Sequence, residues 1–179
     1  MMRNSIIFLS TISIVLFLTA GCEAKYDFNL SPPYVNARMN EVFPESIRNS
    51  LGTTVKETMP DDRYLGYTVS YLDKAITYTV IKCLDKELTF EQLLVQTEPT
   101  KAALEYFNSV IKEKFAAMPY HTFGKKDGFW QAFGKDTEGR RWLAWINSLW
   151  VFILSGKDSD HFKLAVRASR FVSEAGKKE

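Results

Sequence analysis

The sequence predicts an α+β fold in which one antiparallel sheet of about six strands carries helices on its faces. Segments with strand character occur in two groups of three, and an amphipathic helical segment lies between the two groups. Short polar connections inside each group are typical of hairpins, which pair neighbouring strands antiparallel. We therefore expect two three-stranded halves within one domain.

The first half comprises the segments 53–59, 64–71 and 75–84, preceded by a short helix at 44–52 that begins at Pro44 and ends at Gly52. The middle segment alternates, with Leu65 and Tyr67 on one side and Thr68 on the other, as half-buried strands do. Asp73-Lys74 predicts a tight turn that joins the second and third strands as a hairpin.

Two helices are expected between the halves. Thr89 and Gln92 have the spacing of a capping box, which indicates a short helix over 90–95. The segment 99–117 is amphipathic, and its apolar residues recur at steps of three and four: Leu104, Phe107, Ile111, Phe115 and Met118. Its polar face mixes both charges, which favours a core-facing helix over a membrane-surface helix.

The second half comprises the segments 128–133, 141–146 and 149–154. Both alternating sets are apolar in the last two segments, which indicates central strands covered on both faces. Asp158 or Ser159 then caps a final helix that ends at Gly176.

The N-terminus predicts export and a lipid anchor. Arg3 precedes an apolar and hydroxyl run from Ser5 to Ala20, and Gly21 and Cys22 follow directly. This order is typical of a secretory signal peptide, and the run is too short to span a bilayer as a helix. The segment 18–22 resembles the lipobox of bacterial lipoproteins. That resemblance implies cleavage after residue 21 and lipid attachment at Cys22.

Three parts of the chain follow from this processing: a signal peptide at 1–21, a lipidated tether at 22–42 and one globular domain at 43–179. Cleavage removes Arg3 and lowers the net charge from +2 to +1, which suggests no nucleic-acid partner. If Cys22 carries lipid, Cys83 has no partner for an intramolecular disulfide. The order of elements resembles that of the PsbP-like α/β/α proteins, and this resemblance implies a fold but no function.

Few residues suggest catalysis. Asp158, Ser159, Asp160 and His161 could ligate a metal, but acids and serine at a helix start more simply cap the helix. Cys83 could act with His121, but its apolar neighbours favour a buried, inert thiol. We therefore assign no catalytic residue, no metal site and no cofactor.

Four tryptophans are the best candidates for binding a partner, and they lie within 21 residues: Trp130, Trp142, Trp145 and Trp150. They could form a core, or at least one could be exposed and form a partner face. The expected function is that of a membrane-anchored envelope lipoprotein. Its domain is expected to be a noncatalytic module that binds an envelope protein or a cell-wall component. The alternative is a small envelope hydrolase or metal-dependent enzyme. The expected location is the bacterial cell envelope, at the outer membrane in a Gram-negative cell.

Overall fold

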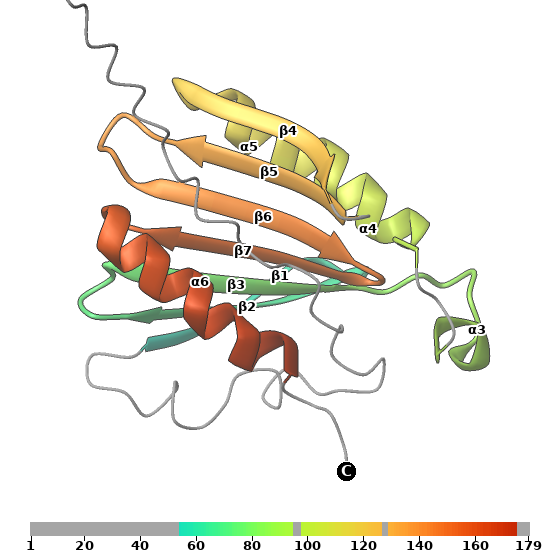
Figure 1. The fold of residues 1–179 in the computed structure, drawn as a ribbon. Coiled ribbons are helices and arrows are strands. Elements are labelled where there is room, and N and C mark those ends of the chain that lie inside the picture. The colour runs from blue at the N-terminus through green and yellow to red at the C-terminus, as the bar shows by residue number, and fades with distance from the viewer. Residues whose placement is uncertain (1–53, 95–97, 127–128, 175–179) are drawn as a thin grey trace, which may run out of the picture.

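The computed structural model describes residues 54–94, 98–126 and 129–174. They form one antiparallel sheet with the strand order β1-β2-β3-β7-β6-β5-β4 (Figure 1). The predicted α+β fold with an antiparallel sheet and helices on its faces is confirmed, and the sheet has seven strands where about six were expected. The signal peptide, Cys22, the tether and the predicted helix at 44–52 lie outside the described residues.

The first half of the sheet is a meander of β1 (Thr54–Asp61), β2 (Tyr64–Tyr71) and β3 (Ile76–Cys83). The predicted hairpin between β2 and β3 is confirmed. Its turn runs from Leu72 to Ala75 and is longer than the Asp73-Lys74 pair. Leu72, Asp73 and Lys74 all have positive φ.

The second half contains four strands: β4 (Tyr120–Lys126), β5 (Phe129–Lys135), β6 (Arg141–Asn147) and β7 (Trp150–Gly156). The strand β4 was not predicted. The two halves meet where β3 pairs with β7, from Ile76 opposite Gly156 to Lys82 opposite Trp150. Residues 143–156 are all buried, which confirms that the last two strands are central.

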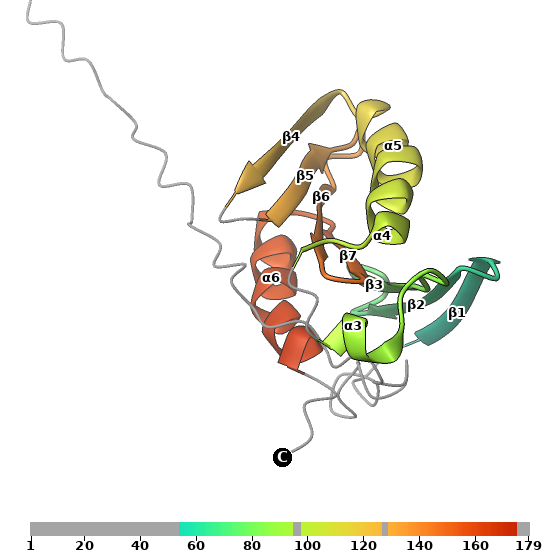
Figure 2. The ribbon, with the colours of Figure 1, turned by 90° about the vertical axis from the view of Figure 1, so that its right-hand side faces the viewer.

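Helices occupy both faces of the sheet (Figure 2). The predicted capping box begins α3 (Phe90–Leu94), since the Thr89 N–H donates to Gln92 Oε1 and the Gln92 N–H donates to Thr89 Oγ1. The predicted amphipathic helix comprises α4 (Lys101–Tyr106), a π-helical turn η1 (Phe107–Ile111) and α5 (Lys112–Ala116). The final helix is α6 (Ser159–Glu174).

The face under α4, η1 and α5 has its own core. Phe107 is 1% exposed, and Ile111 and Phe115 are fully buried against Ala132, Ala144 and Ile146 of the sheet. The buried Thr100 caps α4, accepting from the Ala103 N–H, and its own N–H donates to the Ser148 carbonyl in the β6–β7 turn. The helix is therefore core scaffolding, as its pattern predicts.

The opposite face is covered by α6, which lays Phe162 and Ala165 on β7, β3 and β6. Asp158 begins this helix because its Oδ1 accepts from the backbone N–H groups of Asp160 and His161. Among the described helices, none has the length and apolar character needed to cross a bilayer.

Candidate partner-binding surface

The sheet separates the four candidate tryptophans. Trp145 is 1% exposed and Trp150 is fully buried, and both belong to the core on the α6 side, where Trp145 stacks on Phe152 with ring centroids 4.9 Å apart. Trp142 and Trp130 point to the other side, toward α5. The four therefore form no single face, and Trp145 and Trp150 offer no accessible ring to a partner.

Trp142 is held in place by two polar contacts. Its indole N–H donates to Asp136 Oδ2 at 2.9 Å, and the Lys114 ammonium lies 4.0 Å from the ring centroid. Burial lowers the pKa of Lys114, while the Asp136 carboxylate opposes that change. A ring with both its edge and one face occupied stabilises the β5–β6 connection, and little of it is left for a partner.

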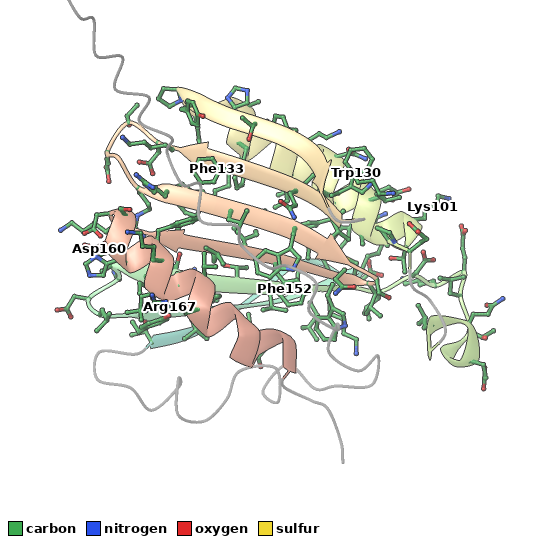
Figure 3. The ribbon with its side chains drawn as sticks, in the orientation of Figure 1. Lys101, Trp130, Phe133, Phe152, Asp160 and Arg167 are labelled. Atoms are coloured by element: carbon green, nitrogen blue, oxygen red, sulfur yellow. The ribbon has the colours of Figure 1, made fainter. Side chains whose placement is uncertain are left out.

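Trp130 is the exposed member of the set, with 36% of its surface accessible. It lies at the start of β5 beside α4 and α5 (Figure 3). Lys125 of β4 is its cross-strand neighbour, and the Lys112 ammonium lies 5.8 Å from its ring centroid. An accessible indole flanked by two cations is suited to burying apolar surface against a partner that brings negative charge.

Strand β4 extends this surface to the edge of the sheet. Residues 120–125 are all exposed, including Tyr120 at 58% and Phe123 at 39%. Phe123 pairs with Ala132, so it is the diagonal neighbour of Trp130 on the same face. On the other face, Tyr120 makes an edge contact with Phe133, with centroids 6.2 Å apart. We call residues 120–125 together with Lys112 and Trp130 the β4 edge.

The electrostatic character of the β4 edge is positive. Strands β4, β5 and β6 contain no Asp or Glu, but they contain Lys125, Lys126, Lys135 and Arg141. Within the described ranges, neither Lys112 nor Lys125 has an ion-pair partner. The nearest acids along the chain are Glu113, Asp127 and Asp136. Among the described residues, no carboxylate occupies either cation beside Trp130, so both can receive an incoming carboxylate.

The candidate metal segment acts as a helix cap. His161 Nδ1 lies 2.7 Å from Asp158 Oδ2, and the hydrogen bonds from the His161 N–H and ring to Asp158 lower the pKa of that carboxyl. In the part of the chain that the structure describes, no three His, Cys, Asp or Glu side chains are placed to hold a metal ion together.

Cys83 and His121 do not meet. Cys83 is fully buried on β3, whereas His121 is exposed on β4, and its Nδ1 lies 2.9 Å from the Met118 carbonyl. Four strand spacings separate β3 from β4, which corresponds to about 19 Å. The two side chains cannot act as a nucleophile and base pair.

A shallow depression near the start of α4 is charged but internally balanced. It is lined by Arg63, Lys86 and Lys101 together with Asp85, Glu87 and Glu105. Arg63 pairs with Glu105 at 3.4 Å, and Lys101 pairs with Glu87 at 3.6 Å. Because its charges neutralise one another, it is a weaker binding candidate than the β4 edge.

Sequence reasoning identified Trp130, with the nearby Lys125 as part of a polar rim, but not the rest of this surface. Tyr120, Phe123 and Lys112 belonged to no motif, and segment 120–126 lacks the alternation that marks a half-buried strand. The one available signal was the run of aromatic and basic residues without acids over 120–126.

No model of a known protein family matches the sequence, and no curated protein is significantly similar to it. Among solved structures, a GTP binding regulator from Thermotoga maritima matches with a TM-score of 0.49 and 14% sequence identity. The match covers 82% of this chain and 95% of that one. A likeness at this level carries no argument about function.

Proposed function

We propose that the chain is an envelope lipoprotein anchored through Cys22, and that its domain is a noncatalytic module that binds an envelope protein or a cell-wall component. The observation that carries the binding role is Trp130, a 36% exposed indole on β5 that lies beside Lys112 and Lys125. Within the described residues, neither lysine has an ion-pair partner. The lipobox supports the anchor and a location in the bacterial envelope, at the outer membrane in a Gram-negative cell.

Trp130 has the properties of an interface anchor. Tryptophan is enriched among residues that contribute most to binding, because it buries a large area while losing few rotamers. Its removal from an interface typically costs about 2 kcal/mol or more, which is roughly a 30-fold loss of affinity. Because the ring is exposed, it contributes little to folding stability and is available for binding.

The alternative is a small envelope hydrolase or metal-dependent enzyme. Such an enzyme needs a histidine within hydrogen-bonding reach of two carboxylates, or an equivalent ligand set. In the described residues, His161 has one carboxylate neighbour and His121 contacts a carbonyl oxygen. This geometry supports the binding module over the enzyme.

Site-specific photocrosslinking tests the binding role. A photoreactive phenylalanine derivative at position 130, whose two aromatic rings keep a large apolar surface in place of the indole, should give one discrete adduct with the full-length protein in growing cells. Mass spectrometry identifies the adduct. The matched control is position 164 on α6, because Leu164 is an exposed apolar residue on the opposite face. An adduct at 130 and none at 164 is the expected result. Equal adducts at both positions, or none at 130, would contradict the proposal.

A further inference from the structure

The two outer edges of the sheet differ in how they are protected from other strands. The edge strand β1 contains Pro60, and its register with β2 shifts between Thr58 and Asp61. Proline and bulges are the usual devices that stop a further strand from pairing. The β1 edge is therefore interrupted in its backbone.

The β4 edge has no such interruption. All seven residues of β4 pair with β5 in one continuous register, from Tyr120 opposite Lys135 to Lys126 opposite Phe129. The strand contains no proline, and within the described residues it ends the sheet. In an antiparallel edge strand, every second residue directs its N–H and C=O groups outward. A row of backbone donors and acceptors is thus presented along β4.

What protects β4 is charge. Lysines on an edge strand discourage pairing because a neutral or basic strand must approach them without compensation. Lys125 and Lys126 occupy one end of β4, Lys112 lies over the adjacent Trp130, and neither β4 nor β5 contains an acid. A second copy of the chain would bring the same positive charges, whereas an acidic strand would neutralise them.

We propose that the β4 edge binds an extended, acidic segment of a partner protein, which adds an eighth strand to the sheet. Main-chain hydrogen bonds to β4 would supply affinity, as in other strand-addition complexes. Phe123 and Trp130 would accept apolar side chains on one face, and Lys112 and Lys125 would select acidic side chains there. This inference rests on the proposed binding role and specifies its partner as acidic and strand-forming.

Synthetic peptides test the inference with the full-length protein purified in detergent. The probe, called the Glu-Val peptide, is a fluorescein-labelled ten-residue peptide in which Glu and Val take turns at every second position and Thr lies between them, so that both reach the same face of an added strand. Binding is measured by fluorescence anisotropy. Two matched peptides separate the contributions: one in which Lys replaces every Glu, and one with N-methyl groups on every second residue along the edge facing β4. The Glu-Val peptide should bind, and each matched peptide should bind at least about tenfold more weakly.

Protein variants locate the site. Lys125→Glu should weaken binding of the Glu-Val peptide by about tenfold, whereas Lys157→Glu, an exposed lysine after β7, should change it less than about twofold. Hydrogen exchange of alternate amides in residues 120–126 should slow on binding. Both variants alter exposed side chains, and a thermal melt of each confirms that the fold is retained.

Each contrary result is informative. Failure of the Glu-Val peptide to bind, or equal binding of the Lys-Val peptide, would overturn the inference. Equal binding of the N-methylated peptide without amide protection would show a charge contact only, and self-association that competes with the peptide would identify a second copy as the occupant. A crosslinked partner at position 130 combined with any of these results retains the proposed function and removes only the strand-addition mode. Peptide binding without a crosslinked partner would support strand addition at β4 and would contradict the proposed binding role in the cell.

Discussion

At the scale of single residues, Gly156 fixes how closely α6 approaches the sheet. A Cβ at this position would meet the backbone N and Cα of Phe162 and lie 2.6 Å from the His161 carbonyl carbon. These are helix backbone atoms and cannot move aside as a flexible side chain could. Gly156→Ala should lower the free energy of unfolding by about 1 to 3 kcal/mol, as overpacking does.

Urea unfolding measures this cost, and Gly124→Ala is the matched control. An added Cβ at Gly124 meets nothing within 4 Å, so the same substitution on β4 should change stability by no more than about 0.5 kcal/mol. Equal effects of the two substitutions would show that α6 adjusts its distance from β7 without strain.

At the scale of elements, the helical segment from α4 to α5 is held by its buried side. Phe107 and Val110 lie in the same π-helical turn, but Phe107 is 1% exposed and Val110 is 42% exposed. Phe107→Ala should cost about 3 to 5 kcal/mol through lost burial and a residual cavity. Val110→Ala should cost no more than about 0.5 kcal/mol. Chemical denaturation of both variants measures this difference in stability. A Phe107→Ala protein that is as stable as the wild type but has lost membrane contact would show that the helix is a membrane-binding surface and not core scaffolding.

The elements that the sequence predicted well are those with a buried side. Segment 64–71 alternates, and residues 142–146 and 149–154 are apolar throughout, because one or both faces of each strand are covered. The strand β4 was missed since its residues 120–125 are exposed on both faces. A strand without a buried face does not need apolar residues at every second position. Pro119 and Gly124 also indicate a loop at this segment. The aromatic side chains of the candidate site that lie on β4, Tyr120 and Phe123, were missed for the same reason.

The tryptophans show a different limit of sequence reasoning. Trp130, Trp142, Trp145 and Trp150 lie close together in the sequence, but their faces depend on strand register, which a cluster of aromatic residues does not specify. Trp145 and Trp142 occupy opposite faces of β6 because three positions separate them in a repeat of two. Only the pairing with β5 and β7 shows which of them is covered.

At the scale of the whole molecule, the proposed anchor determines where the domain operates. Each buried lipid CH₂ contributes about 0.8 kcal/mol to membrane binding, so acylation by several chains makes release negligible. We expect Cys22→Ser to leave the protein unprocessed or to free it from membranes, as measured by fractionation and immunoblotting. The control is Cys83→Ala, which removes the other cysteine and should leave fractionation unchanged. Mature Cys22→Ser protein that still sediments with membranes would contradict the anchor.

The seam between β3 and β7 has a consequence for the order in which the chain folds. The paired residues are separated by about 70 to 80 positions, so β3 has no neighbour on one side until the strand before α6 has been synthesised. The β1–β3 meander and the β4–β7 meander can each form from local hairpins, which close quickly. Joining them requires the slowest loop closure in the sheet. Until then, β3 exposes an unpaired backbone edge together with apolar side chains such as Val80 and Ile81, which are almost fully buried in the folded domain. The chain is therefore most susceptible to aggregation during this interval.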